Sequence, residues 1–435
     1  LHQGVSSAAS DVYKRQLFDG SANFSTLKAL VLWADLYRRT IQYPLNKSGD
    51  QAAFQQAYIA DSLVAYLRDA GVEQGAVGNF LSAQTKTHIS ADPDTITVSL
   101  PGSIGFTAIG RFALPGVPIT IKLASLPKTG RFTFFINTMS PASTKVWEAP
   151  TDMRSGYRRP QYLRSPAMSL STNELTVVSP YGGTLELGFD GASDAVVTVQ
   201  IKGAVSQAFY DTTQGTPDAS AFFSQVTSSS LGWLEIKTPG LEIHSLISNA
   251  MDFLQPSDAQ LADTKNVFPS VAKPYYSRAS GIDMGTYLNE AKRYVMEDAY
   301  QLAGFRVRGL ELTPSVQTFC NSHGWDCTSP SIHAPPTVQH FLSDVRASCG
   351  SMCSGNPITS GSAFEPRGWG ESHEMGHNLQ AFKVYDGISS EVSNNIFPLH
   401  KKWRLFRELG RLGVGYYNEL NDTQAVFDLL SAAYK

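Results

Sequence analysis

The spacing of the apolar residues changes its period twice along this chain of 435 residues. Over residues 18–80 the apolar residues recur with helical spacing, and over residues 88–201 they alternate with a period of two. Helical spacing returns over residues 288–302. Helices and strands bury different sets of positions, so a sequence patterned for one does not suit the other. The pattern therefore predicts an α+β chain with several domains.

We expect a helical N-terminal domain over residues 17–86. Its apolar faces are Leu27, Leu30, Val31 and Ala34 in one helix and Ile59, Leu63 and Tyr66 in another. Residues 87–240 are expected to form a β-sandwich and a linker, because short alternating runs are separated by turn signals. The linker is the polar stretch over residues 206–230, rich in Ser, Thr and Gln. The last domain, residues 241–435, is expected to be mainly helical.

Both ends of the chain are expected to depart from the native protein. Residues 1–16, LHQGVSSAASDVYKRQ, lack the apolar core of a signal peptide and resemble a translated adapter of the kind left in assembled environmental sequences. We therefore set this segment aside as foreign. Residues 428–435 stop inside a helical pattern, so we expect the last domain to be truncated.

Charge and hydropathy argue against a nucleic-acid partner and against a membrane-spanning helix. The net charge is −3 and the pI is about 6.3, and Lys and Arg are not gathered into blocks, so no nucleic-acid partner is predicted. No apolar run approaches the ~20 residues of a membrane-spanning helix, so no transmembrane segment is predicted. With 42% hydrophobic and 17% charged residues, the composition is typical of a globular protein.

All four cysteines fall in one short stretch of the chain. They are Cys320, Cys327, Cys349 and Cys353. Their spacings, C-x6-C and C-x3-C, do not match the common zinc-binding patterns, which favours disulfides in an exported protein. The simplest connectivity pairs neighbours in the sequence, Cys320 with Cys327 and Cys349 with Cys353. Four cysteines allow three connectivities, and the sequence alone does not choose among them.

The residues His373-Glu374-Met375-Gly376-His377 form the pattern H-E-x-x-H. Residues four apart on a helix lie one above the other, so His373 and His377 can direct two imidazole nitrogens at one ion about 2 Å away. Glu374 is rotated by about 100° around the helix and can reach a water on that ion without being a ligand. An apolar stripe on the other side would anchor the helix, and it consists of Met375, Leu379 and Phe382.

A third ligand can come from one of two carboxylates downstream. Glu391 lies fourteen residues after His377, and two histidines with one glutamate and a water form a known catalytic zinc site. Asp386 is the rival, but it lies on a turn, where the chain has too little length to reverse. A three-histidine site is excluded, because Gln380 and Lys383 occupy the positions of its glycine and third histidine. We favour Glu391.

The segments HEMGHNLQ (residues 373–380) and EVSNNIF (residues 391–397) resemble the signature of the enhancin-like, mucin-targeting zinc metallopeptidases of the gluzincin type. Weaker similarity extends back to SPYGG (residues 179–183) and WLEI (residues 233–236). The resemblance implies that residues 241–435 form a zincin-like catalytic domain. It also implies a secreted or cell-surface enzyme that cleaves O-glycosylated, mucin-like proteins.

On the same resemblance, one Zn²⁺ ion is held by His373, His377 and Glu391. In the expected reaction the ion activates a water and polarises the scissile carbonyl of the peptide. Glu374 acts as general base, taking a proton from that water and passing it to the leaving amine.

Other residues are weaker candidates. Those for substrate binding or oxyanion stabilisation are Trp369, Tyr385 and His400. Those for orienting the ligands are Asn378 and Asn395. The histidines near the cysteines, His323, His333 and His340, show no ligand spacing.

Two alternative functions remain open at this stage. In the first, the chain is a glycan-binding or adhesin-like protein whose β-sandwich binds the ligand and whose zinc site is structural or inactive. A closed zinc site with four protein ligands would favour the glycan-binding protein, and an open coordination position would favour the enzyme. In the second, the chain is a general endopeptidase, which has the same chemistry and a different pocket.

Overall fold

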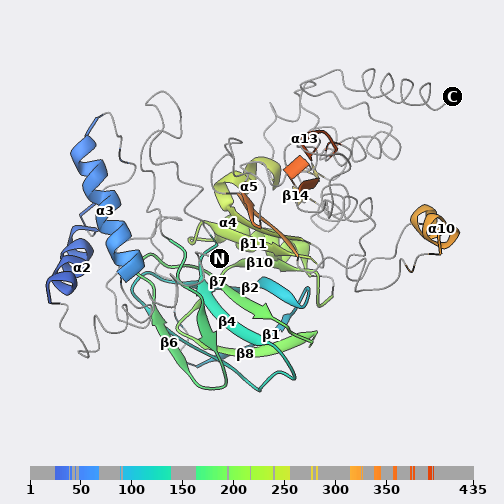
Figure 1. The fold of residues 1–435 in the computed structure, drawn as a ribbon, viewed down its shortest axis with the longest axis horizontal. Coiled ribbons are helices and arrows are strands. Elements are labelled where there is room, and N and C mark those ends of the chain that lie inside the picture. The colour runs from blue at the N-terminus through green and yellow to red at the C-terminus, as the bar shows by residue number, and fades with distance from the viewer. Residues whose placement is uncertain are drawn as a thin grey trace. The chain divides into compact units, whose positions relative to one another are not determined.

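A computed structural model describes most of residues 25–67, 92–138 and 163–254, followed by shorter stretches (Figure 1). These stretches are residues 276–277, 281–282, 314–324, 326, 338–343, 356–359, 373–374, 376–377, 390–393 and 395, and residue 89 is described as well. The chain divides into two compact units. The first comprises Leu1–Gln207 and Ser230–Trp233, and the second comprises Ala208–Ser229 and Leu234–Lys435. No helix in the described stretches is long and apolar enough to cross a membrane.

Two helices of the first unit, α2 (Ser25–Arg38) and α3 (Gln51–Leu67), pack against each other. Their buried apolar residues are Val31 and Ala34 on α2 and Phe54, Ala57 and Ala60 on α3. The expected faces are therefore right in part. Leu30 and Ile59, which were expected to be buried, are 42% and 57% exposed.

A buried polar cluster explains why α2 is rotated away from the expected face. Arg38 Nε donates a hydrogen bond to the Tyr181 hydroxyl at 2.6 Å, and that hydroxyl donates to Asp61 of α3. Arg38 also forms an ion pair with Asp35 at 3.3 Å. Charged groups can be buried only with such partners. The edge of α2 that carries Asp35 and Arg38 therefore faces inward, and Leu30 remains outside.

The rest of the first unit consists of two antiparallel sheets, with strand orders β1-β8-β3-β6 and β5-β4-β7-β2-β9. The strands are β1 (Asp94–Ser99), β2 (Ile104–Ala113), β3 (Pro118–Leu123), β4 (Arg131–Ile136), β5 (Met168–Leu170), β6 (Leu175–Val178), β7 (Gly183–Asp190), β8 (Val196–Lys202) and β9 (Val205–Ser206). Between β6 and β7 the chain turns at Gly182, which has a φ of +70°. A Cβ there would lie 2.4 Å from the Ala113 carbonyl oxygen, so only glycine fits.

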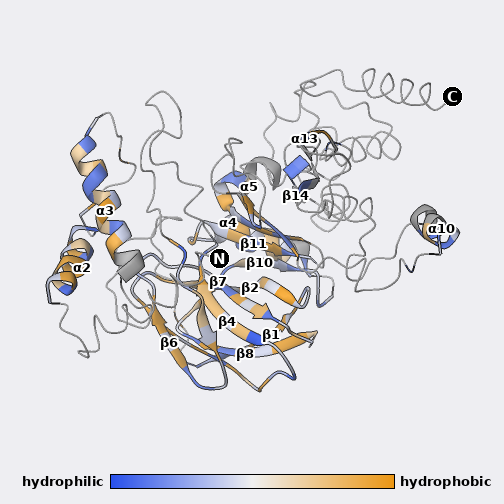
Figure 2. Ribbon diagram, in the orientation of Figure 1, coloured by the Kyte–Doolittle hydropathy of each residue, from blue (hydrophilic) through white to orange (hydrophobic). Residues whose placement is uncertain are grey.

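Alternating side chains of these two sheets share one hydrophobic core, and apolar positions follow the strands in Figure 2. Examples are Ile119, Ile121 and Leu123 of β3 and Phe132, Phe134 and Ile136 of β4. Successive side chains of a strand point to opposite faces, so every second residue lies inside. The predicted β-sandwich is confirmed.

The second unit contains a five-stranded sheet of order β10-β11-β12-β15-β16. Its strands are β10 (Ala208–Asp211), β11 (Trp233–Lys237), β12 (Leu241–Leu246), β15 (Gln339–Ser343) and β16 (Ile358–Thr359). Its other elements are α4 (Ala219–Ser228), α5 (Ile247–Leu254), β13 (Tyr276–Ser277), β14 (Gly281–Ile282), α10 (Pro314–Ser322) and α13 (Ser390–Ser393). The parallel pairs in this sheet are β10 with β11, β12 with β15, and β15 with β16.

Two expectations for this part of the chain need comment. The polar stretch over residues 206–230 is not a plain linker, because it contains β10 and α4. Asp218 caps α4 by accepting hydrogen bonds from the backbone amides of Ser220 and Ala221, which is why a polar segment begins a helix here. The expected helix over residues 288–302 lies outside the described stretches, so a mainly helical last domain is not confirmed.

Candidate metal centre

The H-E-x-x-H segment is helical where the structure describes it, at residues 373–374 and 376–377. His373 and His377 lie one turn apart, and the two ring centroids are 4.9 Å apart with an angle of 88° between the ring planes. Both rings are partly exposed. The helical spacing thus places two imidazoles side by side, as i and i+4 residues on one face.

Glu391 reaches the same point from α13. Its Oε2 atom lies 3.1 Å from His373 Nε2 and 3.3 Å from His377 Nε2. The three side chains form a group of a kind that can hold a metal ion. The structure therefore brings together the three ligands that the sequence predicts. The rival carboxylate, Asp386, lies outside the described stretches.

Asn395 fixes the orientation of His373. The Nδ2 atom of Asn395 donates a hydrogen bond to the backbone carbonyl of Glu391 at 2.9 Å. This contact turns the amide oxygen toward His373 Nδ1, which lies 2.7 Å away. An amide oxygen only accepts hydrogen bonds, so Nδ1 carries a proton, and in the neutral ring Nε2 presents its lone pair to Glu391. Metal-binding histidines are commonly held in this way through their second nitrogen.

The donor atoms at this site fit a zinc ion. The Nε2 lone pair of His373 faces a carboxylate oxygen of Glu391, an arrangement that needs a cation between the two atoms. Zinc in a tetrahedral site binds N and O atoms at about 2.0–2.1 Å, which places neighbouring ligand atoms roughly 3.3 Å apart. The observed separations of 3.1 and 3.3 Å are close to this value.

The pKa of the Glu391 carboxyl group is shifted in the direction that favours metal binding. In the metal-free site, a hydrogen bond from His373 lowers the pKa of Glu391 below its ordinary value. Loss of hydration opposes this shift, and the charges of His377 and His373 add to it. The group therefore stays ionised to lower pH than a free glutamate, and metals bind the ionised form.

The remaining predicted site residues are only partly described. Glu374 follows His373 on the helix, is half-buried and does not belong to the ligand group found among the described residues. Trp369, Tyr385, His400 and Asn378 lie outside the described stretches. So do Cys327, Cys349 and Cys353, while Cys320 is buried on α10. The predicted cysteine pairing is therefore untested.

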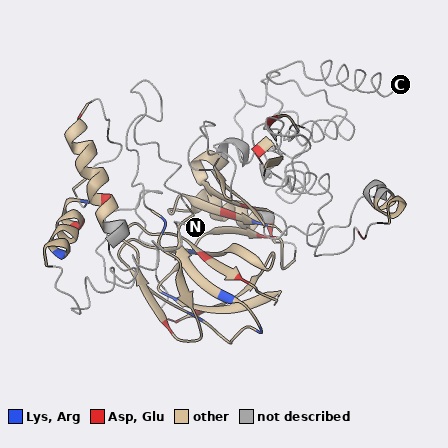
Figure 3. Cartoon of the chain, viewed as in Figure 1, with Lys and Arg blue, Asp and Glu red and all other residues tan. Residues whose placement is uncertain are grey.

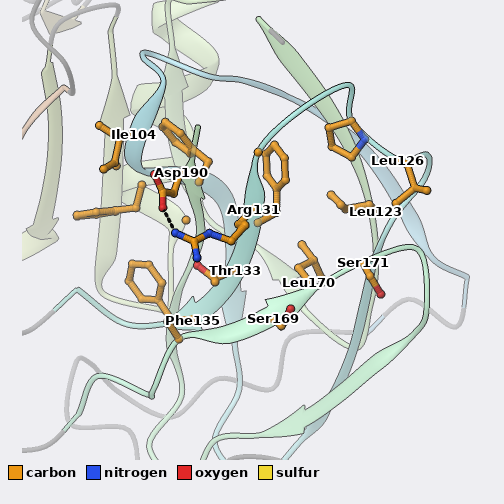
Figure 4. Close-up of a pocket in the computed structure, with 18 of the residues that line it drawn as sticks. Ile104, Leu123, Leu126, Arg131, Thr133, Phe135, Ser169, Leu170, Ser171 and Asp190 are labelled. Atoms are coloured by element: carbon orange, nitrogen blue, oxygen red, sulfur yellow. Dashed lines mark hydrogen bonds and ion pairs between the residues drawn. The ribbon is translucent and has the colours of Figure 1, made fainter. Parts of the chain in front are cut away.

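A cavity of roughly 680 Å³ lies in the β-sandwich of the first unit (Figure 4). Apolar side chains line much of it, among them Ile104, Leu126 and Phe135. An ion pair between Arg131 and Asp190 lies along its wall. This cavity is a second place where the chain could bind a ligand, and the sequence pattern alone did not indicate it.

Two family models match parts of the chain. The model for the immunomodulating metalloprotease helical domain matches residues 5–69, a range that begins inside the segment 1–16 and contains α2 and α3. The model for Peptidase M60, enhancin and enhancin-like, matches residues 316–418, which contain all three candidate ligands.

The chain is also similar to one protein along nearly its whole length. It is 38% identical over 426 residues to the immunomodulating metalloprotease of Pseudomonas aeruginosa, an alignment that covers 94% of this chain and 43% of that protein. A solved structure of this metallopeptidase matches with a TM-score of 0.72 at 36% identity, over 93% of this chain and 43% of that one. Its complex with T-antigen matches with a TM-score of 0.73 at 36% identity, over 93% and 44%.

A further structure of the Pseudomonas aeruginosa protein, in complex with an O-glycopeptide, matches with a TM-score of 0.72. The chain spans less than half the length of these relatives. Identity at this level over nearly the whole chain, together with the matching models, shows that the chain belongs to the family of enhancin and enhancin-like M60 peptidases.

Proposed function

We propose that this chain carries the catalytic centre of a secreted zinc metalloendopeptidase that cleaves O-glycosylated, mucin-like proteins. The observation that supports this function best is the convergence of His373, His377 and Glu391 on one point. The similarity to a metallopeptidase whose solved complexes contain an O-glycopeptide and T-antigen supports the substrate class.

In the proposed reaction, three side chains hold one zinc ion, which when bound activates a water and polarises the scissile carbonyl. Glu374 accepts the proton of that water on its carboxylate and donates it to the nitrogen of the leaving amine. Asn395 keeps His373 in the tautomer whose Nε2 can be a ligand. Position 374 suits the base, because it adjoins a ligand on the helix without belonging to the ligand group.

Loss of metal tests the ligand assignment. The His373→Ala variant should hold one zinc ion fewer than the unaltered protein, because the two remaining ligands hold the ion of this site poorly. Metal analysis of the purified variant measures this, with His323→Gln as a control at an exposed histidine. If the His373→Ala protein held as much zinc as the unaltered protein, the ligand assignment would be wrong.

The substrate class is tested with matched peptides. A site built to hydrogen-bond sugar hydroxyls leaves polar groups unpaired when the sugar is absent, at about 1 to 3 kcal/mol for each group. We therefore expect cleavage of Ser/Thr-rich peptides beside an O-linked N-acetylgalactosamine and no cleavage of the same bare peptides. Equal kcat/KM for the two peptides would reject glycan dependence, but it would not contradict the assignment as a zinc peptidase.

Secretion and disulfide pairing are part of the same proposal. Both follow from the resemblance and from the clustering of the four cysteines. If the protein is made in an oxidising compartment and denatured without reductant, a thiol reagent should detect no free thiols. Four reactive thiols would refute the pairing.

A second candidate function is glycan binding by the β-sandwich with an inactive zinc site. The cavity of roughly 680 Å³ supports it, because ligand sites commonly have about 300 to 1,000 Å³. Under this function, Phe106→Ala in the cavity should abolish binding of an O-glycopeptide, and His373→Ala should leave it unchanged. If Phe106→Ala left the binding unchanged and His373→Ala abolished it, the results would support the peptidase.

A further inference from the structure

The second unit contains another cluster of metal-ligating side chains, on its five-stranded sheet. In the parallel register of β12 and β15, Glu242 lies opposite His340, and His244 is two positions further along β12. Residues two apart on a strand share a face of the sheet, so the three side chains lie on the same face. All three are fully buried.

Glu235 of β11 orients one of these histidines. Its Oε1 atom lies 2.7 Å from His244 Nδ1. An ionised carboxylate only accepts hydrogen bonds, so Nδ1 carries the proton and His244 Nε2 is directed at His340 Nδ1, 2.9 Å away. A carboxylate on the second nitrogen is the usual support of a metal-binding histidine.

The third ligand atom completes the group. Glu242 Oε2 lies 3.9 Å from His340 Nδ1. With His244 Nε2, these atoms all lie within 4.8 Å of one another. Two strands that are far apart in the sequence thus present two imidazole nitrogens and one carboxylate oxygen to a single point.

The charged groups of this sheet are buried together with the three ligands. Glu235, Lys237 and Glu242 are all fully buried, and buried charges are held by opposite charges or by metal ions. The acidic residues on this sheet can be followed in Figure 3.

Protonation of the histidines is the alternative to a cation between them. Protonation of both histidines would provide two positive charges, but it would set two N–H donors against each other across 2.9 Å. A divalent cation provides the same charge and uses both nitrogens as acceptors.

We propose that Glu242, His244 and His340 hold a second divalent cation, of the zinc class, with a structural role. Two imidazole nitrogens and a carboxylate oxygen are ligands that zinc prefers. A tetrahedral zinc ion separates its ligand nitrogens by roughly 3.3 Å, so the two rings need to part by a few tenths of an ångström from 2.9 Å. Full burial leaves no opening for a substrate, so this ion ties β12 to β15 and does not take part in hydrolysis.

Metal content after removal of the first site tests this proposal. The His373→Ala/His377→Ala protein has lost the imidazoles of the first site, so any remaining ion belongs elsewhere. After saturation with zinc alone and dialysis, we expect about two zinc ions per chain in the unaltered protein and about one in the double variant. Addition of His340→Gln should remove that ion, and addition of the exposed His323→Gln should not.

A second substitution covers the case in which His340→Gln protein does not fold. Glu242→Gln keeps the shape of the side chain and removes its charge, and the folded state is checked by near-UV circular dichroism. X-ray absorption by zinc in the His373→Ala/His377→Ala protein should show nitrogen and oxygen ligands, including imidazole.

Two outcomes would overturn the proposal. If folded His373→Ala/His377→Ala protein holds less than about a tenth of a zinc ion per chain, the cluster is only a hydrogen-bonded histidine pair. If the ion stays after Glu242→Gln or His340→Gln in a folded protein, it binds at another place. Neither outcome changes the proposed function, which depends on the first site.

Discussion

Two clusters of this molecule use the same residue types in opposite surroundings. At the first, the side chains of His373 and His377 are 17% and 19% exposed and that of Glu391 is 71% exposed. At the second, the side chains of Glu242 and His340 have no exposed area at all. An open site can admit a substrate, and a closed one can only hold the fold together. The comparison shows that the surroundings, and not the donor atoms, decide what a histidine and glutamate cluster can do.

The largest effect should come from Glu374→Gln, which removes the chemistry of the exposed cluster without emptying it. A positioned base contributes about 10² to 10⁴ to the rate, so we expect turnover to fall at least roughly a hundredfold while zinc is retained. Steady-state kinetics together with metal analysis of the same sample measures both. Near-native turnover would remove Glu374 from the mechanism.

The buried cluster should respond to mutation through stability. His244→Ala removes a hydrogen-bond partner of the buried Glu235 carboxylate, and such a loss costs about 1 to 3 kcal/mol or more of the free energy of unfolding. His373→Ala, at a partly exposed ion pair, should cost less than about 1 kcal/mol in metal-free protein. Urea unfolding in the presence of a chelator compares the two variants. Equal losses would contradict the contrast between the clusters.

A smaller effect is expected at Asn395. The Asn395→Ala variant removes the acceptor from His373 Nδ1, and loss of such a partner commonly lowers metal affinity about 10- to 100-fold. Competition for zinc with a chromogenic chelator measures the affinity. Asn395→Asp keeps an acceptor oxygen and should bind zinc much more tightly than the alanine variant. If both variants bind zinc as the unaltered protein does, Asn395 does not orient the ligand.

The smallest effect concerns protonation of Glu391. Its pKa is lowered in the folded chain, chiefly by the hydrogen bond to His373. The stabilising contribution is therefore complete above the ordinary value of about 4.3 and is lost as the pH falls through the lowered folded value. In metal-free protein, an NMR titration of the Glu391 carboxyl carbon should give a midpoint below the ordinary one. His373→Ala should move that midpoint upward, and an unchanged midpoint would assign the shift to another cause.

The features that were predicted correctly are those that depend on local patterns in the sequence. The period of two identified the β-sandwich, because each strand buries every second residue whatever its partner is. The i, i+4 spacing identified His373 and His377 for a similar reason. Glu391 could be chosen over Asp386 from the length of chain alone. Its i+4 relation to Asn395 was the signal that could have separated Asn395 from Asn378.

The features that were missed depend on contacts between distant segments. The inner edge of α2 is set by the contact of Arg38 with Tyr181, 143 residues away. His340 was dismissed for its lack of ligand spacing, but ligands on a strand need only the right face and a neighbouring strand. That neighbour carries His244, 96 residues earlier, and no local pattern pairs the two strands.

The parallel pairing of β12 with β15 also bears on how the chain folds. It joins segments whose histidines are 96 residues apart, and pairings of this kind slow folding because a long loop must close before any contact forms. During synthesis, β12 emerges from the ribosome well before β15. Until then its edge is open to other chains, and unpaired strand edges promote aggregation. Low temperature weakens apolar association between chains, so it should raise the yield of soluble protein more than any change near the exposed histidines.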